Sequence, residues 1–252
     1  MNTEIVASVD RAIRILNAFT EASAPMTLHD LSLRTGFYKS TILRLVSTLI
    51  EHGCVLRLDN GTYQPGPTLA QWGRLYLGSV KSETHIVPLL EKLAGDTGES
   101  ATFYVRQSDE TRICVARVDG NRSVRDHVRV GDIAPLGTGA GGKALLRFDP
   151  VVRKARPPEA MVIVSIGGRD SEIAGLGTPV FGAGGSLRGA MTVSGTVTRF
   201  TEAAIAKYAR SLLASAMELT VLFGGDPEAH QVALGSNPIR LEFSPKGKPC
   251  AS

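Results

Sequence analysis

The segment from Thr27 to Gly53 constrains the fold more than any other part of this 252-residue chain. Thr27-Leu-His-Asp30 has the form of a capping box, in which each end residue bonds to the backbone amide of the other. A short helix is therefore predicted to begin at Thr27 and to end near Gly36, where a tight turn needs the left-handed conformation. A longer helix is predicted from about Tyr38 to His52, with Gly53 as its stop signal.

The residues on either side complete a known pattern. Ser8 is expected to cap a preceding helix whose apolar residues share one stripe: Val9, Ala12, Ile13, Leu16 and Phe19. Two short strands, Val55–Leu58 and Thr62–Gln64, flank the turn signal Asp59-Asn60-Gly61 and predict a hairpin. Ser32 supplies the small residue where the two helices cross, and residues 1–67 therefore read as a winged helix-turn-helix.

The outward-facing side chains of this unit indicate DNA as its partner. A recognition helix meets base edges and phosphates with its N-terminal half, and the free amides at its start favour a phosphate. The candidate DNA-binding residues are Arg34, Tyr38, Lys39, Ser40, Thr41, Arg44 and Arg57. The net charge of +4 is compatible with this partner but does not demonstrate it, since bases and acids balance in residues 1–67. A small helical bundle with a hairpin and no nucleic acid is the alternative.

A linker helix is predicted over residues 68–80, after Pro65-Gly66-Pro67 ends the hairpin. It has a broad apolar face that consists of Leu69, Trp72, Leu75, Tyr76 and Leu77. Such a face has to be buried, either against a second copy of the chain or against the chain's own second domain. The sequence leaves both possibilities open.

Residues 81–224 are predicted to form an α+β domain with an antiparallel sheet. A helix is expected at Glu83–Thr97, a glycine-rich turn leads into a helix at Gly141–Leu146, and a long helix covers Thr201–Leu222. Strands are expected at Ala101–Val105, Ile113–Val118, Val124–Val130, Met161–Val164, Leu176–Phe181 and Leu187–Val193. Residues 225–252, with four prolines, are expected to be a flexible tail.

Several other functions are disfavoured. Gly137 to Lys143 approximates a nucleotide-binding motif, but Ala144 replaces the hydroxyl that would bind magnesium, so we expect no nucleotide there and only a small anion held by exposed amides. The five histidines stand singly, and Cys54, Cys114 and Cys250 are far apart, which predicts no metal, no disulfide and no cofactor. Without a signal peptide or a membrane span, we expect a cytoplasmic protein.

The chain resembles the IclR family of bacterial regulators from about Val6 to Phe223. The resemblance rests on five segments in this order: Leu31–Leu49, Asn60-Gly61-Thr-Tyr-Gln-Pro-Gly-Pro67, Arg129-Val-Gly-Asp132 with Gly142-Lys-Ala-Leu-Leu146, Ile173-Ala-Gly-Leu-Gly-Thr-Pro-Val-Phe181, and Met191-Thr-Val-Ser-Gly195. It implies a homodimer, or a homotetramer built as a dimer of dimers, on a near-palindromic operator. It also implies a GAF-like C-terminal domain that binds a small-molecule effector.

The resemblance also implies which residues line the effector pocket: Ala140, Gly141, Ser165, Gly175, Thr192 and Ser194. Thr192 and Ser194 alternate along one strand and so face the same side. Two departures stand out. Relatives have two helices where Arg147–Ala160 intervene here, so one wall of the pocket is expected to be absent, rebuilt or supplied by a partner, and many relatives have a cysteine in place of Gly175.

The sequence therefore predicts a DNA-binding transcription regulator, and not an enzyme, whose effector is a carboxylate or an aromatic acid. Two alternatives remain open. One is an enzyme that processes a small acid and carries an appended helical module. The other is a dimerisation scaffold with a degenerate pocket.

Overall fold

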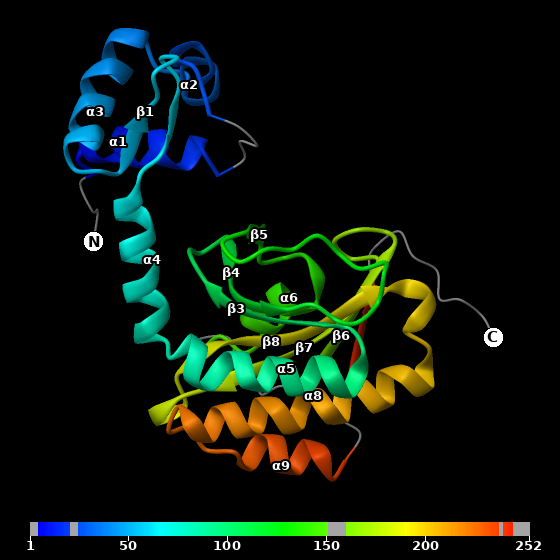
Figure 1. The fold of residues 1–252 in the computed structure, drawn as a ribbon. Helices are drawn as coiled ribbons and strands as arrows, with labels where there is room; N and C mark the ends of the chain where they lie inside the picture. Colours follow the sequence, from blue (N-terminus) through cyan, green and yellow to red (C-terminus); the bar gives the residue numbers. More distant parts are fainter. Residues whose placement is uncertain (1–4, 21–24, 151–159, 237–238, 244–252) are drawn as a thin grey trace. The chain divides into compact units, whose positions relative to one another are not determined.

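The computed structural model describes residues 5–20, 25–150, 160–236 and 239–243 (Figure 1). It separates into two compact units, Met1–Val80 and Lys81–Ser252.

The first unit is a winged helix-turn-helix, as predicted. Its elements are α1 (Ala7–Ala18), α2 (Leu28–Thr35), α3 (Lys39–Glu51), the antiparallel hairpin of β1 (Val55–Arg57) and β2 (Tyr63–Pro65), and α4 (Pro67–Ser79). The helices pack around Ile15, Leu31, Ile42 and Val46, and Tyr63 of the hairpin closes this core. One face of each of α1, α2 and α3 is therefore buried in the unit's own interior, although Val9 and Ile13 of the stripe expected in α1 are exposed.

The turn between α2 and α3 is fixed by interactions at both of its ends. The capping box predicted at Thr27 is present, and Gly36 adopts the left-handed conformation with φ of 72°. The Ser32 hydroxyl donates to the Phe37 carbonyl at 2.7 Å, and the Arg14 guanidinium of α1 donates to the Thr35 carbonyl at 3.3 Å. These bonds set the angle at which α3 leaves the turn.

Two details of this unit differ from the expectations. Ser8 does not cap α1, because the carbonyl of Val6 already accepts from the amides of Val9 and Asp10, so the N-cap is Val6, two residues before Ser8. In α4 no residue is buried, although Leu69 packs against the core of the unit. Trp72, Leu75 and Tyr76 of α4 are exposed.

The second unit is a seven-stranded sheet with helices, which confirms the predicted α+β class. Its strands are β3 (Ser100–Arg106), β4 (Thr111–Val118), β5 (Ile133–Pro135), β6 (Val162–Ile166), β7 (Ile173–Phe181), β8 (Leu187–Thr196) and β9 (Ile239–Phe243). They lie in the order β5-β4-β3-β8-β7-β6-β9, and every neighbouring pair is antiparallel except β6 with β9. Pro135 is on the edge strand β5, where its missing amide is tolerated.

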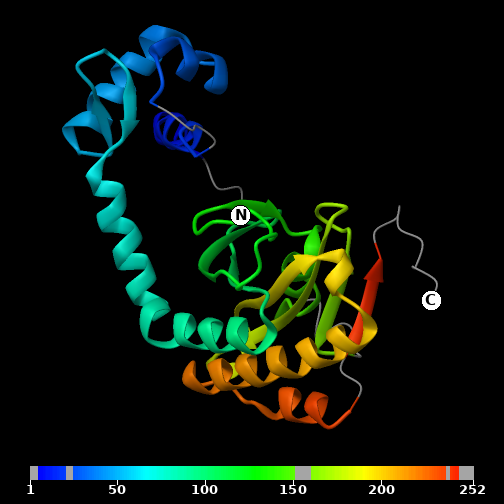
Figure 2. The same cartoon turned by 45° about the vertical axis from the view of Figure 1, so that its right-hand side comes forward.

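The helices of this unit are η1 (Ser82–Ile86), α5 (Val87–Thr97), α6 (Gly139–Arg147), η2 (Ala183–Gly185), η3 (Val197–Arg199), α8 (Glu202–Leu222) and α9 (Glu228–Leu234). Figures 1 and 2 show α5, α8 and α9 together on one side of the sheet and α6 on the other. The side that α6 covers is the one on which the candidate site lies.

The strand expected at Val124–Val130 does not form. Residues 131–135 pair with the outer edge of β4 instead, from Thr111 to Cys114. Side chains satisfy carbonyls of the Val124–Val130 segment, since Arg199 donates to the Val124 carbonyl at 3.1 Å and Arg117 to the Asp126 carbonyl at 3.2 Å. The segment is a loop that two arginines hold in place.

The prediction of a flexible tail from residue 225 is also wrong for the residues that the structure describes there. Helix α9 buries His230 and Ala233. The His230 ring packs edge-on against the Phe181 ring, with 5.9 Å between the ring centroids. Strand β9 pairs in parallel with β6. Residues 244–252, and residues 151–159 of the shortened segment, lie outside the described ranges.

His230 makes the stability of the second unit dependent on pH. Burial lowers the pKa of this histidine below its ordinary value of 6.5, so the folded state holds it neutral. Its contribution is therefore present above about pH 6.5 and is lost as the pH falls through the folded pKa. We expect the His230→Gln variant to lose less stability than the wild type between pH 7.5 and pH 5.5, as measured by scanning calorimetry.

The matched control is Val232→Ala, at an exposed position of the same helix. It should leave both the stability and its pH dependence nearly unchanged, whereas His230→Gln at pH 7.5 should cost about 1–3 kcal/mol. Equal acid sensitivity in the wild type and in His230→Gln would contradict the assignment.

Candidate DNA interface and ligand cavity

The seven candidate DNA-binding residues all lie on α2, on β1 or at the start of α3. Tyr38 is the N-cap of α3 and is exposed, as are Lys39, Ser40 and Arg44 in its first two turns. Thr41 is half-buried, because it lies beside Ile42 on the inner side of the helix. Arg34 on α2 and Arg57 on β1 are exposed as well.

This surface has positive charge and free backbone donors to offer. Lys39, Arg44 and Arg57 form no ion pair with any residue that the structure describes. No side chain caps the start of α3, so its first amides remain available to an anion. Arg34 differs from these three, because its guanidinium donates to the Ala18 carbonyl at 3.4 Å and helps to hold α1 to α2.

One residue of this face was missed in the sequence. Leu43 is 48% exposed and lies between Ser40 and Arg44 on the exposed side of α3. An apolar side chain there can contact a thymine methyl group in the major groove. Leu43 follows Ser40 by three residues and Lys39 by four, so it shares a helix face with them, and this spacing could have predicted its position.

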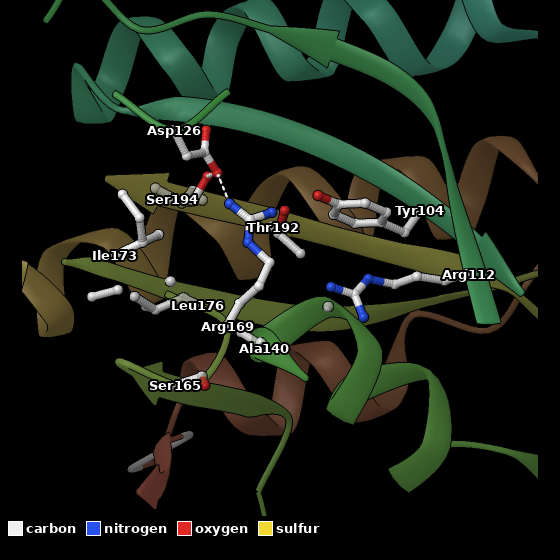
Figure 3. A pocket seen from close by; sticks show the side chains of 16 residues that line it. Tyr104, Arg112, Asp126, Ala140, Ser165, Arg169, Ile173, Leu176, Thr192 and Ser194 are labelled. Carbon is white, nitrogen blue, oxygen red and sulfur yellow. Dashed lines mark hydrogen bonds and ion pairs between the residues drawn. The ribbon is translucent and has the colours of Figure 1, made fainter. Parts of the chain in front are cut away.

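The second unit has a cavity on the α6 side of the sheet, and all six predicted effector residues line it (Figure 3). Ala140 and Gly141 belong to α6, Ser165 to β6, Gly175 to β7, and Thr192 and Ser194 to β8. The free volume at its centre is about 40 Å³, which is room for roughly two to four water molecules. Ile173, Ala174, Leu176 and Val193 add an apolar part to the lining.

Glycine is required at positions 141 and 142 because α6 packs tightly on the sheet. A β-carbon at Gly141 would lie 2.9 Å from both the Thr192 side chain and the Tyr104 ring, and one at Gly142 would collide with the Leu136 carbonyl. The predicted helix is confirmed, but it begins at Gly139, so Gly139, Gly141 and Gly142 lie in the helix and not in a turn before it. Thr138 does not cap α6 with its side chain, which leaves the first amides of a buried helix without partners from the cap.

Arg112 is the feature of this cavity that sequence reasoning did not find. Its side chain is among the largest that are fully buried, with an exposed fraction of 2%, and its guanidinium lies 4.9 Å from the centre of the Tyr104 ring. One nitrogen donates to the Pro135 carbonyl, but Nε has no partner. No carboxylate pairs with it among the described residues, and burial lowers its pKa.

A second group of charges surrounds Asp126. Its carboxylate accepts from Arg117 at 2.7 Å, from Arg169 at 2.9 Å and from the Ser194 hydroxyl at 3.1 Å. Desolvation acts to raise the pKa of Asp126, but these three partners outweigh it, and the pKa lies below its ordinary value. Asp126 is therefore ionised at neutral pH, although only 3% of its side chain is exposed.

Strand alternation does not predict that Arg112 and Arg117 face the same side. They are five residues apart, which in a regular strand places them on opposite faces. The register of β4 against β3 shifts at Val115, because Phe103 pairs with Ala116 and Tyr104 with Cys114. This bulge inserts one residue and places both arginines on the same side of the sheet, where Arg112 lines the cavity and Arg117 binds Asp126. A bulge leaves no clear mark in the sequence.

The remaining polar groups of the cavity differ in what they can still bind. The Thr192 hydroxyl donates to the Thr102 carbonyl at 3.3 Å, whereas the buried Ser165 hydroxyl has no partner.

Burial raises the pKa of Cys114 to about 12, so it remains a thiol at neutral pH. In the described ranges no cluster of His, Cys, Asp or Glu could hold a metal, and no helix is long and apolar enough to cross a bilayer.

Comparison with known protein families gives two matches. Residues 8–59 match the IclR helix-turn-helix domain, and residues 75–161 match the C-terminal domain of bacterial IclR transcriptional regulators. The HTH-type transcriptional regulator KipR of Bacillus subtilis is 24% identical over 222 residues, which span 77% of this chain and 88% of KipR. The regulator XynR of Escherichia coli is 28% identical over 145 residues, 57% of each chain.

Solved structures show the same fold. An IclR transcriptional regulator from Alicyclobacillus acidocaldarius superposes with a TM-score of 0.75 at 22% identity, over 88% of this chain and all of that one. An IclR homolog from Microbacterium hydrocarbonoxydans, solved in complex with 4-hydroxybenzoate, superposes with a TM-score of 0.67 at 17% identity, over 85% of this chain and 100% of that one.

The unpaired charge of Arg112 predicts an unusual response to mutation. Replacing a buried charge that has no counter-ion by an apolar side chain of similar shape costs little. We expect Arg112→Met to change the free energy of unfolding by less than about 1 kcal/mol. Chemical denaturation followed by circular dichroism measures this.

Arg199→Met is the contrasting variant. Arg199 binds the buried Glu99 carboxylate through two bonds of 2.6 and 2.7 Å, so its removal leaves an unpaired buried charge. A loss of about 3–5 kcal/mol is expected. Equal losses in the two variants would mean that Arg112 is held by an interaction as strong as an ion pair.

Proposed function

This chain belongs to the IclR family of bacterial transcriptional regulators, and on that premise we propose that a small carboxylate in the cavity controls its binding to a near-palindromic operator. DNA binding and response to a ligand are general in this family. The class of effector, the residues that bind it and the form of the operator are our proposals.

The observation that carries the choice of effector is the buried guanidinium of Arg112. A full positive charge in the interior, with an unpaired Nε and no carboxylate beside it, favours an anionic ligand. The unpartnered Ser165 hydroxyl and the first amides of α6 add neutral donors in the lining of the same cavity. A carboxylate can accept from all three groups.

The rest of the lining suits the remainder of such a molecule. Ile173 and Leu176 offer apolar contact, Gly175 leaves room beside them, and Thr192 and Ser194 place two hydroxyls on one face of β8. The 4-hydroxybenzoate bound by the Microbacterium hydrocarbonoxydans homolog is an aromatic carboxylate. It supports the carboxylate class and does not identify the ligand of this chain.

In the DNA complex we assign the N-terminal half of α3 to the major groove. Lys39, with Ser40 and Thr41, would contact phosphate, Arg44 would reach a base edge, and Arg57 of the hairpin would contact the backbone beside it. Tyr38 and Arg34 would border this contact. Two copies of the chain, related by a two-fold axis, would read the two halves of the operator.

A second candidate function is supported by one observation. The free volume of about 40 Å³ is small for an effector cavity, which favours a dimerisation scaffold without a ligand. A screen by thermal shift with acetate, benzoate and 4-hydroxybenzoate separates the two functions. Stabilisation by any of these acids supports a sensor, and a scaffold responds to none of them.

The residue test of the effector site uses Arg112→Met. It should abolish the stabilisation by those acids, because their carboxylate loses its charged donor. The control is Arg210→Met, at an exposed position of α8 that does not line the cavity. Undiminished stabilisation in Arg112→Met would remove Arg112 from the site.

The DNA test measures affinity for the promoter region beside the protein's own gene, at about 50 and 200 mM salt. Arg44→Ala should cost about 1–3 kcal/mol and relax the preference at one base pair. Lys39→Ala should weaken binding to all sequences alike and lower the salt dependence by about one counterion. Arg210→Ala serves as the control, and affinity that does not fall with salt would contradict the phosphate contacts.

A further inference from the structure

Arg169 lies across the cavity, and no sequence pattern predicted this position. It follows Gly167 and Gly168 in the loop between β6 and β7, and Gly167 has a φ of 65° that favours glycine. Its side chain runs past Ala140 to Asp126, which lies on a different loop (Figure 3). Unlike Arg112, it keeps 28% of its side chain exposed. Arg169 therefore lines the cavity and is also partly open to solvent.

Asp126 can release Arg169 without becoming an unpaired buried charge. It would keep its bond of 2.7 Å to Arg117, a buried side chain with 6% exposure, and its bond of 3.1 Å to the Ser194 hydroxyl. Arg117 is itself held by Asp119 at 2.7 Å. Arg169 is thus the exchangeable partner in this group.

The charges around the cavity do not balance. The ion-pair network consists of Arg117, Arg125 and Arg169 against Asp119 and Asp126, and Arg112 lies beside it without a counter-ion. Four arginines against two aspartates leave an excess of two positive charges on these described side chains. One carboxylate neutralises only half of that excess.

The two guanidiniums in the cavity lining have different partners, the Pro135 carbonyl for Arg112 and the Asp126 carboxylate for Arg169. A β-carbon built at Gly139 would lie 3.5 Å from Nη2 of Arg112 and 3.8 Å from the β-carbon of Arg169. Arg169 therefore begins beside the head of Arg112 and extends away from it toward Asp126. Two guanidiniums in the lining of one cavity, one of them without a counter-ion and the other with an exchangeable one, suit two anionic groups on one short molecule.

Building on the proposed function, we propose that the effector is a short dicarboxylate. One of its carboxylates binds Arg112, and the other replaces Asp126 as the partner of Arg169. This exchange requires Arg169 to move, and its movement enlarges the cavity. With Arg169 in place, the cavity has room for only a few water molecules. Arg169 is then the residue that distinguishes dicarboxylates from monocarboxylates.

The test compares acids of equal chain length on the full-length protein: succinate with butyrate, glutarate with valerate, and adipate with hexanoate. Calorimetric titration measures each affinity. At least one dicarboxylate should bind about tenfold to hundredfold more tightly than its monocarboxylate partner, which is the range for one added hydrogen-bonded ion pair. Arg169→Gln should remove that preference, and Arg169→Lys, which keeps the charge, should restore part of it.

Arg210→Gln on α8 is the control and should keep the full preference. Circular dichroism melts establish that each variant folds. Equal affinity for the two acids of every pair, or a preference that survives Arg169→Gln, overturns this inference but leaves the carboxylate effector standing. Failure of every acid of both classes to bind overturns the inference and the proposed effector together.

Discussion

The second unit keeps a full positive charge in its interior without a carboxylate beside it. Arg112 is held there by the Tyr104 ring and the Pro135 carbonyl, neither of which neutralises it. If stability were the only requirement at this position, an apolar side chain would serve it better, because desolvating a charge is costly and an apolar side chain packs as well. The glycines of α6 bring the first turn of this helix beside the same charge, and together they make a cavity that favours an anion.

The first unit depends on a different constraint, which is the rigidity of one turn. The capping box at Thr27, the left-handed Gly36 and the bond from Arg14 to Thr35 hold α2 and α3 at a set angle. None of these interactions uses a side chain of α3. They leave the start of α3 uncapped and its lysine and arginine without ion pairs among the described residues. The fold thus presents charge and free amides on an edge that it does not need for its own stability.

Local signals explain why so much of the first unit could be predicted. A capping box, a turn glycine and helical spacing act within a few residues, so Thr27, Gly36 and the core of α3 follow from the sequence. The six predicted cavity residues also lie together, because the resemblance placed them. Arg112 could not be placed, since a bulge at Val115 decides its face, and Asp126 lies in a loop that distant arginines fix. Helix α9 was missed because its short apolar pattern stands among prolines.

The proposed role of Arg112 as the anchor of an anionic ligand is tested most directly by a crystal structure of the protein with a bound carboxylate. We expect a carboxylate oxygen within hydrogen-bond distance of the Arg112 guanidinium, with the first turn of α6 beside it. A carboxylate bound elsewhere in the second unit, with Arg112 still stacked on Tyr104 and touching no ligand atom, would contradict it.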